Sequence, residues 1–302
     1  MDLGYTTIYY IVHSSQNLRL FHILDLWWMY YSLSLLWYLC MKIASRNVNG
    51  IRAIIGKWFY DWVKQNNPDI ICLQEVKSFE TQLPPEFRYH MAEYNRIRHV
   101  GEKPGYSGVV TFYKKGLKFV SWISRFESVE HFHEEGRVVE TKFQEFTLLN
   151  LYFPNGGERA DGTEMLSYKL KFYEHFIHYI NKLKANGEKV ITCGDFNICH
   201  KEIDIARPKE NADSIWFLPI ERAEMDKLEA NGYVDVFRHY HPDLADQYTW
   251  WSYRAWARPR NVWRRLDYFR VSNDVLSHIK KITHETATEW SDHCPILLEL
   301  SF

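Results

Sequence analysis

The chain has 302 residues, 46% of them apolar, and its formal net charge at pH 7 is −1. This length allows one large domain or two ordinary ones with a sizeable core, and we expect a single α/β unit. The near-zero net charge excludes a protein whose whole surface attracts nucleic acid, so such a partner would need a local basic patch. Five cysteines, an odd number without a CxxC pair, predict reduced thiols in the cytoplasm and argue against a zinc site.

The first forty residues differ in composition from the rest. Leu26 to Cys40 reads LWWMYYSLSLLWYLC, which is shorter than the roughly 20 apolar residues of a membrane-spanning helix. The segment also lacks the basic start and cleavage site of a signal peptide. We interpret residues 1–40 as an extension outside the folded domain and expect no membrane association, with a membrane anchor as the alternative. The domain proper is predicted to cover residues 41–302.

Beyond Met41, short apolar runs alternate with amphipathic ones. Strands are predicted at 43–48, 70–74, 108–113, 146–152, 190–194, 266–271 and 296–300. Helical spacing of apolar residues appears at 58–63, 166–183 and 219–228. Many short strands with a few helices, in mixed order and without a linker, predict two sheets packed face to face with helices outside.

Polar side chains fall at the ends of these predicted strands. They are Asn47, Asn49, Glu75, Tyr152, Asn155, Asp195, Asn197, Asp267, Asp292 and His293. A single Asp or Asn at a strand end usually caps a turn. Carboxylates from several strands, however, can converge on a hard cation such as Mg²⁺, whose other positions hold water and substrate phosphate. His293 would then offer a hydrogen-bond donor to a phosphoryl oxygen.

The stretch ITCGDFNICH shows how one such strand is expected to end. Gly194 is predicted to let the backbone turn tightly. Asp195 and Asn197 are predicted to project on one side, because strand residues two apart share a face.

A basic and aromatic segment follows at residues 248–268. It reads YTWWSYRAWARPRNVWRRLDY, in which five arginines alternate with tryptophan and tyrosine. Aromatic rings can stack on DNA or wedge into it while guanidinium groups bind the flanking phosphates. A merely solvated face is the alternative; we expect DNA binding.

A series of motifs gives the chain a family likeness. NVNGIR, LQEVK, GYSG, EEGR, LYFPNG, GDFNICHKEIDIARPKE, FLPIER, GYVDVFR, YTWWSYR, RLDYF and SDHCPI occur in this order. Residues 41–302 therefore resemble exonuclease III and the related apurinic/apyrimidinic (AP) endonucleases of base-excision repair. The resemblance implies a catalytic domain with a four-layer α/β sandwich of DNase I-like fold and dependence on Mg²⁺, with Mn²⁺ as a possible substitute.

The resemblance also implies an activity and a substrate. The activity is hydrolysis of the DNA phosphodiester 5′ to an abasic site, with 3′–5′ exonuclease and 3′-phosphatase or phosphodiesterase activity beside it. The implied substrate is double-stranded DNA with abasic sites or blocked 3′ ends, and the protein is expected to act as a monomer in the cytoplasm, at the nucleoid.

Roles for individual residues follow from the same resemblance. Glu75 resembles the principal metal ligand, with Asn49 and Asp292 near the metal. Asp195 resembles the residue that orients or deprotonates the attacking water, and Asn197 its neighbour that holds Asp195 and the phosphate; both are expected at the metal as well. His293 resembles the donor to the phosphate, oriented by Asp267, and Tyr152 and Asn47 support the cluster. The implied DNA-binding residues are Arg52, Lys77, Tyr106, Arg137, Asn155, Trp250, Tyr253, Arg264 and Leu266.

Two other readings of the chain remain open. The first is a different phosphoesterase of the same superfamily, with a substrate other than DNA. The second is a catalytically impaired DNA-binding relative, because Arg46 and Arg264 replace tryptophans that the family usually carries. Burying an unpaired guanidinium in the first strand would cost on the order of several kcal/mol.

The departures from the family follow a pattern. Tryptophan stands where relatives typically carry glycine at positions 58, 122, 216, 263 and 290. Glycine to tryptophan is a very large volume change, and a turn with positive φ would reject it. We hypothesise that the chain is written with the wrong genetic code, in which UGA read as Trp encodes Gly and some CGN codons read as Arg encode Trp.

The codons of the gene test this hypothesis directly. We expect UGA at positions 58, 122, 216, 263 and 290, and CGN codons at Arg46 and Arg264. Sequencing that finds UGG at the five tryptophan positions would rule the hypothesis out.

Overall fold

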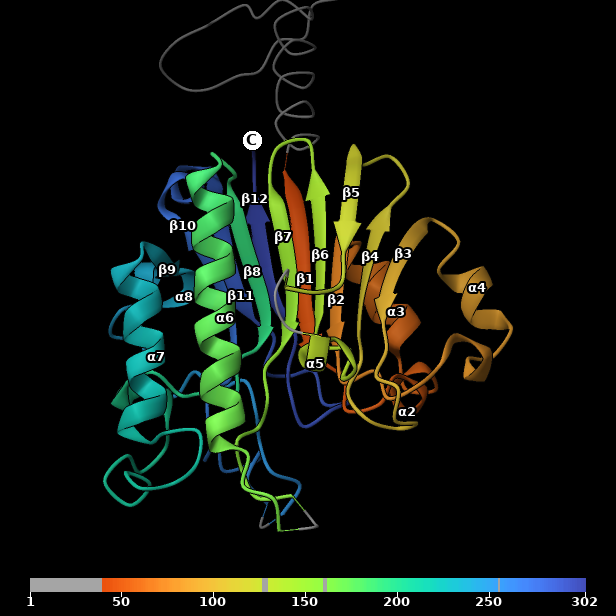
Figure 1. Ribbon diagram of the computed structural model, residues 1–302. Helices are drawn as coiled ribbons and strands as arrows, with labels where there is room; N and C mark the ends of the chain where they lie inside the picture. Colours follow the sequence, from red (N-terminus) through yellow and green to blue (C-terminus); the bar gives the residue numbers. More distant parts are fainter. Residues whose placement is uncertain (1–39, 127–129, 160–161, 255) are drawn as a thin grey trace, which may run out of the picture. The chain divides into compact units, whose positions relative to one another are not determined.

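A computed structural model describes residues 40–126, 130–159, 162–254 and 256–302 (Figure 1). The apolar run predicted from Leu26 therefore lies almost wholly outside the described residues. Among the described helices, none is long and apolar enough to span a membrane. Residues 41–300 form one unit by their internal contacts. Cys72, Cys193, Cys199 and Cys294 are buried thiols rather than disulfide partners.

The first sheet brings Asn47 and Glu75 together at the same end of its strands. Its strand order is β11-β12-β1-β2-β4-β3. The bounds are β1 (Met41–Asn47), β2 (Ile70–Gln74), β3 (Tyr94–His99), β4 (Val109–Lys114), β11 (Ile279–His284) and β12 (Ile296–Leu300). Since β1 and β2 run parallel with Asn47 opposite Gln74, the polar residues that end both strands emerge side by side.

The second sheet places three predicted site residues at one end of its strands. Its strand order is β5-β6-β7-β8-β10-β9. The bounds are β5 (Phe119–Ile123), β6 (Val138–Phe143), β7 (Thr147–Tyr152), β8 (Val190–Asp195), β9 (Tyr233–Asp235) and β10 (Asp267–Ser272). Asp195 lies opposite Tyr152 of parallel β7 and opposite Asp267 of antiparallel β10.

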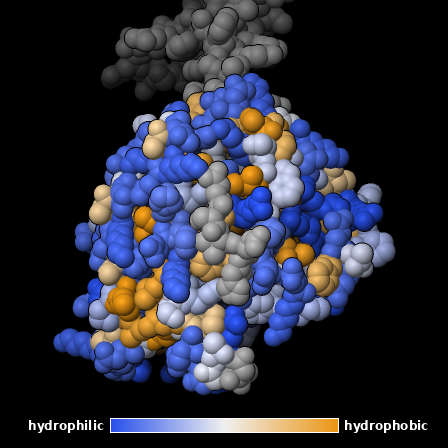
Figure 2. Space-filling view, in the orientation of Figure 1, coloured by the Kyte–Doolittle hydropathy of each residue, from blue (hydrophilic) through white to orange (hydrophobic). Residues whose placement is uncertain are grey.

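The two sheets pack face to face between two layers of helices, which confirms the predicted four-layer sandwich (Figure 1). Helices α2 (Ile51–Ile55) and α3 (Phe59–Asn66) pack on the first sheet. Helices α6 (Leu166–Ala185) and α7 (Pro219–Ala230) pack on the second. The remaining helices are α4 (Glu86–His90), α5 (Glu130–His133), α8 (Val236–Tyr240) and the 3₁₀ turns η1 (Glu80–Gln82), η2 (Glu202–Asp204) and η3 (Asn273–His278). The face in Figure 2 is largely hydrophilic, as expected when the apolar residues fill these layers.

Every strand and helix predicted from the sequence is present, and β2 and β12 have the predicted bounds. The prediction missed β3, β5, β6, β9 and β11. Four of these, β3, β5, β9 and β11, are the edge strands of the two sheets. In β3 and β11, basic residues that discourage pairing with other chains weaken the apolar pattern, and β9 has only three residues. Strand β5 reads FVSWI, and its composition does not explain why the prediction missed it.

The explanation predicted for Gly194 is wrong, although the glycine is required. Gly194 lies inside β8 rather than in a turn, at φ 138. A Cβ atom there would lie 1.9 Å from the carbonyl oxygen of Leu151 on β7. The glycine therefore permits a close approach of two parallel strands just before Asp195.

Three described tryptophans occupy backbone positions that favour glycine. Trp58, Trp216 and Trp256 have φ values of 71, 76 and 52. Trp58 and Trp256 are 72% and 80% exposed, so little packing offsets the strain. Trp122, Trp263 and Trp290 lie outside this backbone region. The geometry thus supports the genetic-code hypothesis at two of the five suspected positions and adds Trp256.

Replacing Trp58 by glycine should stabilise the protein by about 1 kcal/mol, because it removes a bulky side chain from the left-handed region. Urea denaturation measures the change in the free energy of unfolding. Trp122→Gly is the matched control, since Trp122 is also exposed but lies in strand β5. This control should lose stability, and a loss at Trp58→Gly as well would contradict the strain argument.

Candidate active site

The side-chain amide of Asn47 joins the two sheets at their common edge. Its Nδ2 donates to Glu75 Oε1 at 2.8 Å and to Asp195 Oδ2 at 2.9 Å. Its Oδ1 accepts from the backbone N–H of Asn49 at 2.9 Å. Asn47 is fully buried, so this amide fixes how the two carboxylates lie relative to each other.

The side-chain oxygens of Glu75 and Asn49 together bind a positively charged group. The ammonium of Lys77 lies 2.6 Å from Glu75 Oε2 and 2.7 Å from Asn49 Oδ1. Burial pushes the pKa of Glu75 up, but Lys77 and the Asn47 amide outweigh it and hold the pKa below its usual value. The carboxylate therefore stays ionised, and the hard oxygen donors around Lys77 are of the type that Mg²⁺ or Mn²⁺ prefers.

Asp292 closes this side of the site. Its carboxylate accepts from Asn49 Nδ2 at 3.2 Å, from Trp250 Nε1 at 3.0 Å and from Ser291 Oγ at 3.0 Å. Burial raises the pKa of Asp292, but neighbouring His293 and these donors lower it by more, so the net shift is downward. Asp292 is thus an ionised carboxylate held in one orientation.

Asp195 and Asn197 are brought together by a mechanism other than strand alternation. Strand β8 ends at Asp195, and Asn197 lies beyond it at φ 53. The backbone N–H of Asn197 donates to Asp195 Oδ1 at 2.9 Å, and its side-chain amide donates to Asp195 Oδ2 at 3.3 Å. The prediction that both project from one strand face is therefore wrong, while the predicted contact between them is present.

Asp195 is a carboxyl group that is difficult to ionise. Burial raises the pKa of Asp195 to about 7, against the attraction of His293 and together with repulsion from Asp267 and Glu75. A carboxylate with a raised pKa is a stronger base than an exposed one near neutral pH.

His293 and Asp267 form a buried pair beside Asp195. His293 Nδ1 lies 2.8 Å from Asp267 Oδ2, and Nε2 lies 3.9 Å from Asp195 Oδ2. Burial lowers the pKa of His293, but Asp267 more than offsets it and raises the pKa to about 10. The imidazole is therefore a charged donor whose orientation is set by Asp267.

Tyr152 links the polar cluster to a buried arginine. Burial and the neighbouring Glu75 carboxylate raise the pKa of Tyr152 well above its usual value. The guanidinium of Arg137 lies 4.8 Å from the centre of the Tyr152 ring and donates to the Tyr106 hydroxyl at 2.8 Å. Glu135 pairs with Arg137 at 2.6 Å, so Arg137 holds the two tyrosines from behind.

The predicted DNA-binding residues differ in how accessible they are. Arg52 and Asn155 are exposed, Tyr253 is 73% exposed, and Lys77 is partly exposed at the site. Tyr106 and Trp250 are half-buried. By contrast, Arg137, Arg264 and Leu266 are buried and support neighbouring side chains.

Four residues of the site have left-handed backbone angles. Asn49, Glu75, Lys77 and Asn197 have φ values of 45, 50, 48 and 53. Such angles are uncommon for residues other than glycine and gather at functional sites, where surrounding bonds offset the strain. Here Asn47 bonds to Asn49 and Glu75, Asp195 bonds to Asn197, and Lys77 pairs with Glu75, which indicates a preorganised site.

The two unusual arginines are accommodated in different ways. Arg46 Nη2 donates to the carbonyl of His293 at 2.9 Å, but its Nε and Nη1 have no partner. Burial lowers the pKa of Arg46 to about 10, and its guanidinium lies 4.9 Å from the Trp290 ring. Arg264 is better satisfied, because Asn211 and Ser214 each accept from it at 3.2 Å.

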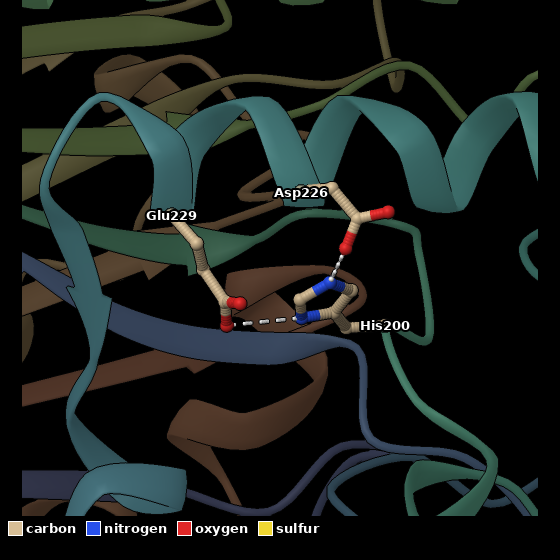
Figure 3. A group of neighbouring side chains, drawn as sticks. All are labelled: His200, Asp226 and Glu229. Carbon is tan, nitrogen blue, oxygen red and sulfur yellow. Dashed lines mark hydrogen bonds and ion pairs between the residues drawn. The ribbon is translucent and has the colours of Figure 1, made fainter.

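A second group with metal-binding residue types lies outside this cluster (Figure 3). His200 Nε2 lies 2.8 Å from Asp226 Oδ1, and Nδ1 lies 3.4 Å from Glu229 Oε1. Buried Arg270 already lies 3.2 Å from Nδ1. Because the two carboxylates face opposite ring nitrogens and a guanidinium supplies the positive charge, the group is an ion network that ties α7 to the loop after β8.

Sequence reasoning missed a buried ion network behind the aromatic segment. Arg265 is fully buried and pairs with Asp204 at 2.8 Å and with Asp235 at 2.6 Å. The network anchors the chain immediately before Asp267. Its residues stand in the motifs EID, VDV and RLD, but motif order alone does not show that distant charges meet.

Comparison with known proteins agrees with this geometry. The Endonuclease/Exonuclease/phosphatase family profile matches residues 47–293. An exodeoxyribonuclease of Bacillus subtilis (strain 168) is 38% identical over 262 residues, which is 85% of this chain and 98% of that protein. DNA repair nuclease APEX1 of Danio rerio is 38% identical over 264 residues, 86% of this chain and 82% of that protein.

Solved structures show the same likeness in three dimensions. An AP endonuclease from Archaeoglobus fulgidus matches with a TM-score of 0.75 and 27% identity, over 85% of this chain and 98% of that chain. An AP endonuclease from Leishmania major matches with a TM-score of 0.78 and 26% identity, over 88% of this chain and 89% of that chain. The chain therefore belongs to the endonuclease/exonuclease/phosphatase family, with exodeoxyribonucleases and AP endonucleases among its relatives.

Proposed function

We propose that this protein is an AP endonuclease that hydrolyses the DNA phosphodiester 5′ to an abasic site, with 3′–5′ exonuclease and 3′-phosphatase activity. The observation that carries the proposal is the bonded cluster of Glu75, Asp195 and His293, which Asn47 and Asp267 hold at one edge of the sandwich. The relatives named exodeoxyribonuclease and DNA repair nuclease support the same assignment.

The cluster supplies the groups that phosphodiester hydrolysis requires. Hydrolysis adds negative charge to the phosphate oxygens, so a site must offer a proton donor, a positioned water and positive charge. In our proposal Asp195 orients and deprotonates the water, held by the amides of Asn47 and Asn197. His293 donates a hydrogen bond to a non-bridging oxygen, and its positive charge offsets the charge that develops there. Tyr152 is close enough to Glu75 and Asp195 for both carboxylates to raise its pKa.

The residues present fit a divalent cation, and members of this family are metal-dependent nucleases. We propose that Glu75 binds Mg²⁺ or Mn²⁺, with Asn49, Asp292, Asp195 and Asn197 nearby, in place of the Lys77 ammonium. Such a cation would neutralise charge on the phosphate and the leaving oxygen.

A cavity and an exposed tyrosine flank the cluster and favour duplex DNA as the substrate. The cavity, about 670 Å³ next to Tyr152, is lined by Tyr106 and Asn155 and by charged side chains of both signs, which are Lys103, Arg137, Arg159, Glu102, Glu134, Glu135 and Glu158. On the other side Trp250 contacts Asp292, and Tyr253 stands exposed. A small phosphate ester would leave both flanks unused, whereas a DNA strand would contact both. We propose a monomer acting on DNA with abasic sites or blocked 3′ ends.

Incision of a duplex with one synthetic abasic site tests the proposal. Residues 41–302 should make a single nick 5′ to the lesion with Mg²⁺, and EDTA should abolish it. Asp195→Asn should slow cleavage by roughly 100-fold or more, because it removes the base. Asp226→Asn, an exposed carboxylate outside the cluster, is the matched control and should cleave like wild type.

Two results would point to the other readings. Hydrolysis of a soluble phosphate ester without any cleavage of DNA would favour another phosphoesterase. DNA binding without metal-dependent cleavage would favour an impaired relative. In that case Arg46→Trp and Arg264→Trp, combined with glycine at the suspected tryptophans, would distinguish an impaired protein from a mistranslated sequence.

His293 should remain protonated well above pH 7 in the metal-free protein. Its pKa is raised from 6.5 to about 10, so its contribution to folding stability is fully present below pH 6.5 and is lost as the pH rises through about 10. NMR of ¹⁵N-labelled imidazoles, assigned with His293→Gln, should show no transition for His293 between pH 6 and 8.

Asp267→Asn provides the comparison for this titration. Without the Asp267 carboxylate, burial dominates and the pKa of His293 should fall. A wild-type His293 that titrates near pH 6.5 would contradict the proposed charged donor.

A further inference from the structure

Lys169 is a lysine without exposed surface, located beneath the candidate active site. It stands in the first turn of α6 and is 0% exposed. Its Nζ donates to the carbonyl oxygen of Asn197 at 2.6 Å, to that of Asn155 at 3.1 Å and to Glu221 Oε1 at 2.5 Å. All three donors of the ammonium are therefore used.

The ion pair with Glu221 does not by itself explain this arrangement. Burial lowers the pKa of Lys169, and the Glu221 carboxylate opposes that shift without reversing it. A pair that only joined α6 to α7 would need one donor. The other two donors reach main-chain oxygens of two separate loops, one after β7 and one after β8, and each loop carries a predicted phosphate-binding asparagine.

The loop after β7 is shaped to lie on this lysine. Gly156, adjacent to Asn155, has φ 86, and a Cβ atom there would lie 2.7 Å from Lys169 Cδ. Only a residue without a side chain lets the loop pack this closely against the lysine stem. The packing of this loop on Lys169 therefore depends on the glycine at position 156.

The loop after β8 connects Lys169 to Asp195 through Asn197, which bonds to both residues. The side-chain amide of Asn197 donates to the Phe153 carbonyl at 2.9 Å as well as to Asp195. A shift of the Asn197 backbone would therefore change the bonds that orient the Asp195 carboxylate.

We propose that Lys169 is a positioning residue, which fixes the separation of the Asn155 and Asn197 loops and thereby the phosphate and the attacking water between them. The inference rests on the function proposed above. Because Lys169 has no exposed surface, it acts through the two carbonyl oxygens and not directly on the substrate.

Comparison of a double variant with a matched single variant tests this role. Lys169→Met combined with Glu221→Gln removes the ammonium and the opposing charge together, while Gln can still accept from the Leu218 N–H at the start of α7, as Glu221 does. Glu221→Gln alone keeps the amine on both carbonyls. The measurements are single-turnover cleavage of the abasic duplex with Mg²⁺, the Kd for the same DNA in EDTA, and Tm.

The double variant should cleave at least about tenfold more slowly, since a small misplacement of reacting groups has a large effect on rate. Its Kd should rise by less than about threefold, because Asn155 is one of several predicted DNA contacts and others, such as Arg52 and Tyr253, lie outside the two loops. Glu221→Gln should keep a rate within about threefold of wild type even if its Tm falls. If the double variant does not fold, Gly156→Ala displaces the same loop without touching the charges and should show the same loss of rate.

Three outcomes would overturn the inference. A folded double variant that cleaves at the wild-type rate would exclude a positioning role. Equal losses of rate in the single and double variants would show that only the ion pair matters. Wild-type protein that never nicks the duplex would refute the proposed function and this inference with it, whereas the first two outcomes leave the proposed function intact.

Discussion

The structure of the site depends on one buried amide. Asn47 ends the central strand of one sheet and donates to carboxylates on both sheets, Glu75 and Asp195. Two carboxylates near each other in a buried site repel, and a donor between them offsets that repulsion while fixing their distance. The close approach of β7 and β8 at Gly194 then places Tyr152 opposite Asp195. The edge of the sandwich is thereby a rigid support for charged groups.

The pKa values of the neighbouring acid and base at this edge are both shifted upward, for different reasons. Burial raises the pKa of Asp195, whereas the Asp267 carboxylate raises that of His293. The same neighbours thus favour a base and a charged donor side by side at neutral pH. Behind them, Lys169 and Arg265 are fully buried cations that pair with carboxylates and hold the loops. Buried pairs of this kind contribute little net stability, but they fix geometry.

Left-handed backbone angles have two different meanings in this chain. At Asn49, Glu75, Lys77 and Asn197 the side chains bond to one another or to Asn47 and Asp195, so the strain is offset within the site. At Trp58 the indole is mostly exposed and offers no comparable bond. The first pattern is typical of functional sites, and the second is expected where a glycine has been replaced.

The sequence by itself determined the layered α/β architecture, because buried strands appear in it as apolar runs. It also located the polar residues at the ends of those runs, which the fold brings together. It did not reveal β3 and β11, whose basic residues hide the strand period, or the left-handed turn at Asn197. Lys169 left one trace, a charge on the buried stripe of α6 that holds Phe172, Tyr173 and Phe176. Only the tertiary structure decided that Lys169 reaches Asn155 and Asn197, and that Arg137 lies behind two tyrosines. Such contacts join residues far apart along the chain, and their partners are selected by packing rather than by any local pattern.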